Sequence, residues 1–517
     1  MASGDEQREV IAFLRDPTSY TQNGGAVEVV ETHCSLVFLA GGYAYKLKRA
    51  VKYPYLDFSS PALRQAACAA ELRLNRRTAP QIYLGVRAIS RHADGRLQWG
   101  RGEDGSGTPI DFVVVMRRFD QRDLFDNMAA RGALAAPLLY ALCAHIAAFH
   151  ADAERCPAQG GGAAMAAIAE TAIGVLRERR AAGFSAAQID RVAAALRREL
   201  QGLGPLLDRR RDAGEVRRVH GDLHLRNVCL VDEKPVLFDC IEFSDDLASI
   251  DVLYDLAFLL MDLDHRGLCD FANLVLNRYL DLTGEDDGLA AMPLFLALRA
   301  AIRAHVTATM AEHGWGGADP AAEIAQACRY LAAAEATLAP APARLIAIGG
   351  LSGSGKSTLA AGLAPAVGRR PGARVLRSDV LRKLRFGSEP EQPLPPAAYA
   401  PEVTERVYRD LCARAAVALR AGYSVIIDAV ALRPDERGAF AAVAADAGVG
   451  FAGLWLEAPA EAMAARLGAR RGDASDASRD VLALQVAQPA GAVEWTRIDA
   501  AGNADATLAA ARRALFC

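Results

Sequence analysis

The chain has 517 residues, of which 52% are hydrophobic and 23% are charged, and its formal net charge is -3. This length exceeds one ordinary domain, and the composition is that of a globular protein, which excludes a disordered chain. The small net charge gives no reason to expect a polyanionic partner, so nucleic acid is disfavoured.

The first part of the chain is predicted to form a small β-rich lobe over 1–119 and a larger helical lobe over 120–338. Strands with strand-type residues and a Gly41-Gly42 turn open the small lobe, and a helix with a polar cap follows them. The helical pattern of the second lobe breaks at the glycines 160–162. The expected elements of the small lobe are strands within 27–49, at 82–89 and at 110–119, and a helix at about 60–78 capped by Asp57, Ser59 or Ser60.

The helical lobe contains a specific motif, 220-HGDLHLRN-227, which is followed by 236-VLFDCIEF-243. The pattern H-G-D-x-x-x-x-N with a later aspartate at the end of an apolar strand resembles the aminoglycoside-phosphotransferase and choline-kinase group of the protein-kinase-like fold. The resemblance implies that Asp222 accepts or orients the proton of the acceptor hydroxyl. It also implies that Asn227 and Asp239 hold Mg²⁺ on the phosphates of ATP.

The same resemblance assigns partners in the small lobe. Lys46, after the glycine turn, is predicted to reach the phosphates of ATP, with Glu71 of the helix as its ion-pair partner, and Lys48 and Lys52 are rival lysines. No G-x-G-x-x-G precedes Lys46, so we expect the loop over the phosphates to be built differently. Within the motif, His220 is expected to orient the loop, and His224 is left open between packing and substrate contact.

A new domain is predicted over 343–517, because an alanine- and proline-rich stretch at 336–344 is followed by the apolar run that starts at Leu345. Strand and helix patterns then alternate, which indicates a parallel sheet covered by helices. The expected strands lie at 344–349, 373–378, 423–428, 451–456 and 493–498, and the expected helices at 356–367, 402–421, 434–447 and 459–471.

Residues 350-GLSGSGKS-357 match G-x-x-x-x-G-K-[ST] between an apolar strand and a helix pattern. The glycines allow backbone N–H groups to surround phosphate oxygens, Lys356 should bridge the β- and γ-phosphates, and Ser357 should offer its hydroxyl to Mg²⁺. The predicted nucleotide-binding residues of this loop are Gly350, Gly353, Ser354, Gly355, Lys356, Ser357 and Thr358.

Further polar residues follow the strands of this domain. Asp379, at the end of the second strand, is predicted to accept the proton of an acceptor hydroxyl, and Arg382 one turn later to hold an anionic group of the substrate. Asp428, at the end of the third strand, is predicted to organise Mg²⁺ or water. Arg470 and Arg471 precede a polar loop and are predicted to close over the nucleotide as a lid.

The residues Ser378, Asp379 and Arg382 and the arginine-bearing lid resemble those of small P-loop kinases related to gluconate kinase, chloramphenicol phosphotransferase, polynucleotide kinase and zeta toxins. Val430 stands where many relatives have a threonine. The whole chain resembles bacterial proteins that fuse an aminoglycoside-phosphotransferase-like domain to an AAA-type kinase domain. The fold class that this implies is α+β for the first domain and α/β for the second.

The ten cysteines occur singly, with no C-x-x-C pair, so neither a zinc site nor a disulfide framework is predicted. The polar N-terminus has no signal-peptide core, and no apolar run approaches the roughly 18 residues that span a bilayer. We therefore expect a cytoplasmic protein without a membrane partner.

The leading hypothesis is a bifunctional ATP-dependent kinase that uses Mg²⁺ and phosphorylates hydroxyls of small polar metabolites. Two alternatives remain open: one domain is an ATP-binding regulatory module, or the second domain is a nucleic-acid end kinase or toxin-like kinase. The resemblance leaves the acceptor of each domain open.

Overall fold

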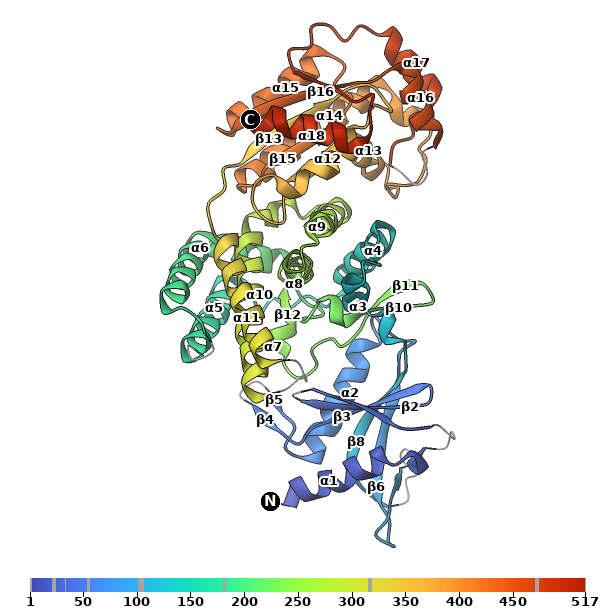
Figure 1. Ribbon diagram of the computed structural model, residues 1–517, viewed down its shortest axis with the longest axis vertical. Coiled ribbons are helices and arrows are strands. Elements are labelled where there is room, and N and C mark those ends of the chain that lie inside the picture. The colour runs from blue at the N-terminus through green and yellow to red at the C-terminus, as the bar shows by residue number, and fades with distance from the viewer. Residues whose placement is uncertain are drawn as a thin grey trace. The chain divides into compact units, whose positions relative to one another are not determined.

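The structure is a computed structural model, and it describes residues 2–20, 25–32, 34–53, 56–100, 107–179, 183–314, 319–469 and 474–516. Its contacts divide the chain into two compact units (Figure 1). Unit 1 consists of Met1–Asp262 and Phe295–Ala336, and unit 2 consists of Leu263–Leu294 and Thr337–Cys517. The boundary expected between 338 and 343 stays a prediction, and unit 2 also includes the earlier segment Leu263–Leu294.

The small lobe of unit 1 is built on an antiparallel sheet of six strands in the order β1-β2-β3-β8-β6-β7. The expected turn joins β2 to β3, with Ala40 opposite Tyr43 and with Gly41 at a φ of 57°, which glycine adopts without strain. The strands are β1 (Glu28–Glu31), β2 (Ser35–Ala40), β3 (Tyr43–Lys48), β6 (Tyr83–Arg91), β7 (Leu97–Trp99) and β8 (Thr108–Arg117), with a separate pair β4 (Lys52–Tyr53) and β5 (Leu56–Asp57).

Helix α2 (Pro61–Asn75) packs against β8 and β6 of this sheet. It begins after Ser60, whose hydroxyl accepts the N–H of Leu63 at 3.3 Å, so Ser60 is the cap among the three predicted candidates. Pro61 at the first helical position has no N–H to leave unsatisfied. Helix α1 (Ala2–Arg15) buries Leu14 in the core beneath β2, β3 and β8.

The second lobe of unit 1 is mainly helical, as its sequence pattern predicted. The break expected at 160–162 is the start of a helix, where Gly160 has a φ of 71°. Its helices are α3 (Phe125–Ala130), α4 (Ala136–Asp152), α5 (Gly161–Glu178), α6 (Ala186–Ala213), α7 (Asp245–Ala248), α8 (Val252–His265), α10 (Met292–His313) and α11 (Pro320–Thr337). Two antiparallel pairs complete it, β9 (Val216–Arg218) with β12 (Ser249–Asp251) and β10 (Val228–Val231) with β11 (Lys234–Leu237).

Unit 2 contains the predicted parallel sheet, with five strands in the order β14-β15-β13-β16-β17. The strands are β13 (Arg344–Gly349), β14 (Arg374–Arg377), β15 (Val425–Asp428), β16 (Gly450–Glu457) and β17 (Thr496–Asp499), and all five were expected. Its helices are α9 (Cys269–Thr283), α12 (Lys356–Leu363), α13 (Ser378–Arg385), α14 (Pro401–Arg420), α15 (Pro434–Asp446), α16 (Ala460–Ala469), α17 (Arg479–Ala487) and α18 (Ala504–Phe516). The sequence did not predict α13, α17 and α18 as separate helices.

Helix α9 covers the edge strand β14, which explains why its segment belongs to unit 2. The side chain of Asn277 accepts the N–H of Val375 at 2.7 Å, and that of Asn273 donates to the carbonyl of Ala373 at 3.0 Å. These amides satisfy backbone groups that an edge strand leaves open. The guanidinium of Arg374 is fully buried and bonds to Asp286 and Asp281, each at 2.7 Å.

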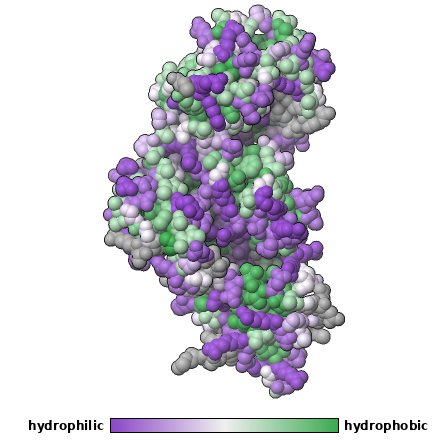
Figure 2. Space-filling view, in the orientation of Figure 1, coloured by the Kyte–Doolittle hydropathy of each residue, from purple (hydrophilic) through white to green (hydrophobic). Residues whose placement is uncertain are grey.

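One helical segment among the described residues, Asp286–His313, is long and apolar enough to cross a membrane by length and composition. Of its most apolar window, 72% is buried inside the structure, as is common for a core helix of a soluble protein. Hydrophilic and apolar residues are interspersed over the face of the chain in Figure 2. The expected absence of a membrane partner stays a prediction.

Candidate active sites

Strand β3 of unit 1 directs two lysines toward one glutamate of α2. The amino group of Lys46 lies 2.8 Å from Glu71 Oε1 and 2.5 Å from Asp239 Oδ1. Lys48, two residues along the strand and therefore on the same face, contacts the second oxygen of Glu71 and also Glu242. The predicted Lys46–Glu71 pair is thus present, whereas the rival Lys52 is exposed and pairs with Asp57 at 2.7 Å.

The centre of this network, where Glu71 lies between the two lysines, is buried. The side chain of Glu71 is 0% exposed and that of Lys48 is 1% exposed. Burial raises the pKa of Glu71, but the two lysines outweigh burial and hold that pKa below its ordinary value. The pKa of Lys46 is raised, because Asp239 and Glu71 outweigh the effect of burial. All three groups therefore stay charged at neutral pH.

Asp239 follows β11 in a backbone conformation that side chains rarely adopt, with a φ of 64°. Its N–H donates to the hydroxyl of Tyr83 at 3.2 Å, and its side chain is 40% exposed. Backbone strain of this kind persists only where the surrounding structure fixes it. Here the strained backbone places a solvent-exposed carboxylate beside Lys46.

The motif 220–227 brings Asp222 and Asn227 together. The amide nitrogen of Asn227 donates to the carboxylate and to the main-chain carbonyl of Asp222, each at 2.9 Å. Its carbonyl oxygen is then the atom left for a cation. With the exposed carboxylate of Asp239, the available donors are hard oxygens, which fit Mg²⁺.

His224 packs within the loop 220–227, and its contact with substrate stays a prediction. Its Nδ1 accepts the N–H of Arg226 at 3.2 Å, so the neutral ring carries its proton on Nε2, which lies 3.3 Å from Asp222 Oδ2. The ring also packs edge-on against Phe258 at 5.0 Å. Burial raises the pKa of Asp222, but His224, Arg303 and His220 outweigh burial and lower it, so Asp222 is ionised at neutral pH.

Asp255 of α8 anchors the loop 220–227, a role that the sequence did not predict. Its carboxylate accepts the N–H of His220 at 3.2 Å and the N–H of Gly221 at 2.8 Å, and it lies 3.1 Å from His150. Gly221 has a φ of 82°, and a Cβ there would meet the carbonyl of Leu247 at 3.1 Å. The available signal was an aspartate in the first turn of a strongly apolar helix that also contains Asp262 and Asp264.

In unit 2 the residues 350–355 form a compact loop, and Lys356 and Ser357 begin α12 directly after it. Gly350, Gly353 and Gly355 have φ values of 136°, 83° and 100°. A Cβ on Gly353 would meet the carbonyl of Met463 at 2.6 Å, so this loop requires glycine there. The amino group of Lys356 bonds to the carbonyls of Gly350 and Leu351 at 2.9 and 3.0 Å.

Two further residues of the P-loop motif differ in exposure, and a residue after β15 contacts the loop. Ser354 is buried, and its hydroxyl has no hydrogen-bond partner among the described residues. Thr358 is exposed on the first turn of α12. Val430, which replaces a hydroxyl-bearing residue of many relatives, accepts the N–H of Gly350 through its main-chain carbonyl at 3.1 Å.

Ser357 and Asp428 are in contact at the carboxyl end of β15, as predicted for two ligands of one cation. The hydroxyl of Ser357 donates to Asp428 Oδ2 at 2.6 Å. Arg377, which the sequence reading missed, donates to that hydroxyl at 3.1 Å and lies 3.3 Å from Asp428. A hydroxyl and a carboxylate in contact beside a phosphate loop fit Mg²⁺, whose remaining ligands are usually water and phosphate.

Asp379 lies on the first turn of α13, next to the candidate cation ligands Ser357 and Asp428. Burial raises its pKa and so does Asp428, while a hydrogen bond from Ser475 and the charges of Arg377 and Lys356 act in the opposite direction. The net result is a pKa above the ordinary value for aspartate. A carboxylate of raised pKa is a better proton acceptor than an ordinary aspartate.

Arg382 lies one turn after Asp379. Its side chain is 6% exposed, one nitrogen donates to the carbonyl of Ala398 at 2.7 Å, and the guanidinium lies 4.9 Å from the ring centre of Tyr399. Its Nε has no hydrogen-bond partner among the described residues. The hydroxyl of Tyr399 donates to Asp476 at 2.5 Å, and Asp476 also binds Lys383. Tyr399, Lys383 and Asp476 were missed, because they come from segments far apart in the sequence.

Of the lid arginines, Arg470 and Arg471 lie outside the described residues. Arg466, which precedes them on α16, donates to the carbonyls of Ala500 and Gly502 at 2.8 and 2.9 Å and lies 3.5 Å from the carbonyl of Ser354. It therefore joins the P-loop to the turn before α18.

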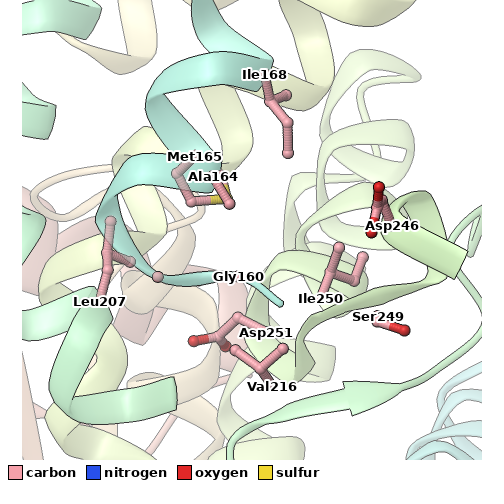
Figure 3. A pocket seen from close by; sticks show the side chains of 11 residues that line it. Gly160, Ala164, Met165, Ile168, Leu207, Val216, Asp246, Ser249, Ile250 and Asp251 are labelled. Atoms are coloured by element: carbon pink, nitrogen blue, oxygen red, sulfur yellow. The ribbon is translucent and has the colours of Figure 1, made fainter. Parts of the chain in front are cut away.

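A pocket in unit 1 lies apart from these residues, between α5, α6, β9 and β12 (Figure 3). The carboxylate of Asp251 at its wall is committed to Arg210 at 2.7 and 3.0 Å. None of the predicted site residues lines it. Its lining residues are Gly160, Gly161, Ala164, Met165, Ile168, Leu207, Val216, Asp246, Ser249, Ile250 and Asp251.

Comparisons with known proteins match both units. The model of the phosphotransferase enzyme family matches residues 48–295, and that of an AAA domain matches residues 345–490. An uncharacterized protein of Mycobacterium tuberculosis is 33% identical over 484 residues, which cover 92% of this chain and 93% of that protein.

Solved structures resemble one unit each. A sugar kinase from Janibacter sp. HTCC2649 is 25% identical and covers 33% of this chain and 94% of its own, with a TM-score of 0.25. A choline/ethanolamine kinase family protein from Mesorhizobium loti is 14% identical and covers 64% of this chain and 99% of its own, with a TM-score of 0.36.

Proposed function

We infer the function from the premise that this chain belongs to a family of proteins in which a phosphotransferase-family domain is followed by an AAA-type P-loop domain. We propose that the chain is a bifunctional ATP-dependent kinase, and that each unit transfers the γ-phosphate of ATP to a hydroxyl of a small polar metabolite. One observation supports this most strongly: each unit combines a lysine, oxygen ligands for a cation and a further aspartate.

In unit 1, Lys46 is the residue proposed to bind the phosphates, with Glu71 fixing its amino group. Asn227 and Asp239 would hold Mg²⁺, which neutralises charge on the phosphates when it is bound. Asp222 orients the acceptor hydroxyl and takes its proton, and the hydrogen bond from Asn227 fixes the carboxylate for this step.

In unit 2, the main-chain N–H groups of 350–357 and Lys356 bind the phosphates, and Ser357 with Asp428 would hold Mg²⁺. Asp379 takes the proton of the acceptor hydroxyl. The buried and partly unsatisfied guanidinium of Arg382 supports an acceptor that carries an anionic group. The lid arginines Arg470 and Arg471 remain part of this proposal.

The test is formation of ADP with Mg²⁺ and a panel of sugars, sugar acids, amino sugars, amino alcohols and nucleosides. The variants are Asp222→Ala and Lys356→Ala, with the exposed Arg197→Gln as a matched control outside both sites. We expect one acceptor-stimulated rate to be lost in Asp222→Ala alone and another in Lys356→Ala alone, with each loss about 10²-fold or more.

Other outcomes separate the alternatives. Retention of both rates in both variants contradicts the assignment of the two sites. ATP binding at both sites without any stimulated turnover supports a regulatory module instead. Phosphorylation of oligonucleotide ends that weakens steeply with salt supports the nucleic-acid kinase alternative for unit 2.

A further inference from the structure

One carboxylate of unit 2, that of Asp476, binds three groups that come from two other segments. The amino group of Lys383 on α13 lies 2.7 and 2.6 Å from its two oxygens. The main-chain N–H of Leu394 donates to Oδ2 at 3.0 Å, and the hydroxyl of Tyr399 donates to the same oxygen at 2.5 Å. The side chain of Lys383 is 1% exposed and that of Asp476 is 19% exposed, so water hardly screens their ion pair.

These contacts hold the segment 392–399 against α13. The amino group of Lys383 also donates to the carbonyl of Gln392 at the start of the segment, while Tyr399 at its end is bound to Asp476. Movement of this segment would leave a buried charge and its hydrogen-bonding partners unsatisfied, which is costly. The segment is therefore fixed at both ends.

The same segment supports the guanidinium of Arg382, the residue proposed to bind an anionic group of the acceptor. One nitrogen of Arg382 donates to the carbonyl of Ala398 at 2.7 Å, and the guanidinium lies 4.9 Å from the ring centre of Tyr399. A guanidinium that faces an aromatic ring keeps the N–H groups at its edge able to donate. Its Nε is buried and has no hydrogen-bond partner in the part of the chain that the structure describes. The orientation of Arg382 thus depends on Tyr399, which depends on Asp476.

The chain that follows Asp476 contacts the P-loop. On helix α17, the side chain of Gln485 accepts the N–H of Ser352 at 2.8 Å. One short stretch of chain therefore contacts two parts of the proposed site, through Asp476 on the side of Arg382 and through Gln485 on the side of the nucleotide. This makes Gln485 a matched comparison for Asp476.

We propose that Asp476 is a positioning residue for the acceptor of unit 2: through Tyr399 it keeps the guanidinium of Arg382 where the anionic group of the acceptor binds. The proposal rests on the proposed kinase function of unit 2, and it adds the residue that fixes the acceptor-binding arginine. In this role Asp476 contacts neither the acceptor nor ATP. Loss of its contacts should therefore weaken acceptor binding and leave nucleotide binding unchanged.

The experiment uses the full chain with Asp222→Ala, so that the site of unit 1 is silent. ADP formation is measured with Mg²⁺ and four anionic hydroxyl compounds, glycerate, gluconate, glycerol 3-phosphate and glucose 6-phosphate, and with uncharged glycerol and glucose. The variants are Asp476→Asn and Tyr399→Phe, and thermal unfolding is measured for each. Tyr399→Phe keeps the ring and removes only the hydroxyl of a residue that is 41% exposed, so it tests the proposal even if Asp476→Asn does not fold.

Two further variants serve as comparisons. Gln485→Ala removes the contact of the same stretch with the P-loop. Arg385→Gln is the control, because Arg385 is also on α13 but pairs with Asp410, and its side chain is 36% exposed.

We expect an anionic compound to stimulate turnover. Asp476→Asn should raise the KM for that acceptor by about 10- to 30-fold and Tyr399→Phe by about 3- to 10-fold, because a charge-assisted hydrogen bond is weakened or lost. The KM for ATP should stay within about twofold of the parent, since the P-loop is untouched. Gln485→Ala should raise the KM for ATP instead, and Arg385→Gln should behave as the parent.

Equal rises in both KM values for Asp476→Asn, with a lower unfolding temperature, overturn the inference, because Asp476 then only maintains the fold. An acceptor KM that Tyr399→Phe leaves unchanged also overturns it. Stimulation by glycerol or glucose alone overturns it and leaves the proposed kinase function intact, because Arg382 then has no anionic group to bind. If no compound supports turnover that depends on Lys356, the proposed function of unit 2 fails and the inference fails with it.

Discussion

Lys46 and Lys48 both contact Glu71, but their surroundings differ. Lys46 also faces Asp239, whose side chain is 40% exposed, whereas Lys48 lies between two carboxylates that are 0% and 5% exposed. We expect Lys46→Met to abolish turnover by unit 1 with a modest effect on stability. Lys48→Met should instead lower the free energy of unfolding by about 3–5 kcal/mol, because two buried carboxylates lose their shared cation.

Denaturation by guanidinium chloride measures the effect on stability, and ADP formation measures the effect on turnover. Lys48→Arg, which keeps the charge, is the matched control and should recover part of the stability. Wild-type stability in Lys48→Met would contradict the structural role that the buried network assigns to this lysine.

The pKa values of the two proposed proton acceptors are shifted in opposite directions from that of an ordinary aspartate. The two activities are therefore predicted to depend differently on pH. The pKa of Asp379 is raised, mainly by burial, so as pH falls this carboxylate is protonated early and the activity of unit 2 is lost first. The pKa of Asp222 is lowered, because His224 and Arg303 outweigh burial, so this carboxylate stays ionised and the activity of unit 1 persists to lower pH.

The measurement is kcat/KM against pH for each activity, with the other silenced by Lys356→Ala or Asp222→Ala. Since the loss of rate follows protonation of the base, the acid limb of unit 2 should lie at higher pH than that of unit 1. Coincident acid limbs, or unit 1 failing first, would show that other groups control these profiles.

At the residue scale, the sequence predicted the positions that occur in motifs with fixed spacing, such as Asp222 with Asn227 and Ser357 after Lys356. It did not predict Arg377 or Asp255. Their roles depend on contacts between distant segments, as in the 34 residues that separate Gly221 from Asp255. Asp255 was visible only as a charge within an apolar run, which many buried helices contain for structural reasons.

At the element scale, helix α16 restricts the P-loop. Gly353→Ala would place a Cβ within 2.6 Å of the carbonyl of Met463 and would also strain a residue at a φ of 83°. We expect this variant to weaken nucleotide binding by unit 2 by more than tenfold and to lower its stability by about 1–3 kcal/mol.

Gly438→Ala is the control, since Gly438 lies inside α15 and a Cβ there meets nothing within 4 Å. It should leave nucleotide binding unchanged and raise the free energy of unfolding by about 0.5–1 kcal/mol. Binding is followed by titration with a fluorescent ATP analogue. Equal binding by wild type and Gly353→Ala would show that the loop can move away from α16.

All strands of the parallel sheet were predictable, and so were those of the small lobe except the short edge strand β7, because alternating and continuous apolar patterns indicate strands wherever a face is buried. Helix α13 was not predicted as a helix, although its residues Asp379 and Arg382 were. It is eight residues long and contains five buried positions, including Arg382 and Lys383, so its burial does not follow the polarity of its sequence. Tertiary contacts to Ala398 and Asp476 determine it instead.

At the scale of the whole molecule, unit 2 depends on the segment Leu263–Leu294. We predict that a fragment over 337–517 is unstable, because Arg374 would lose both Asp281 and Asp286 and because the edge strand β14 would lose the amides of Asn273 and Asn277.

Circular dichroism and thermal unfolding of the purified fragment, compared with the full chain, check this. Arg374→Met in the fragment is the informative variant, because it removes the charge that would be left unpaired and should recover part of the stability. A fragment that unfolds at the same temperature as unit 2 of the full chain would contradict the assignment of α9.

The division of the chain into a kinase-like part and a P-loop part was predictable from the two motifs and the alanine- and proline-rich stretch between them. The membership of α9 was not. Its apolar face resembles that of any helix in the first domain, and only the pairing of its asparagines with residues about a hundred positions later reveals its place.

That separation affects how the protein is made. Asn273 leaves the ribosome 100 residues before its partner Ala373, which at about 5–20 residues per second is a delay of roughly 5–20 s. During synthesis, α9 is therefore complete while the strand that it covers does not yet exist. In a nascent chain at this stage, the face of α9 that later contacts β14 is uncovered. This is the interval in which a chaperone can protect that face.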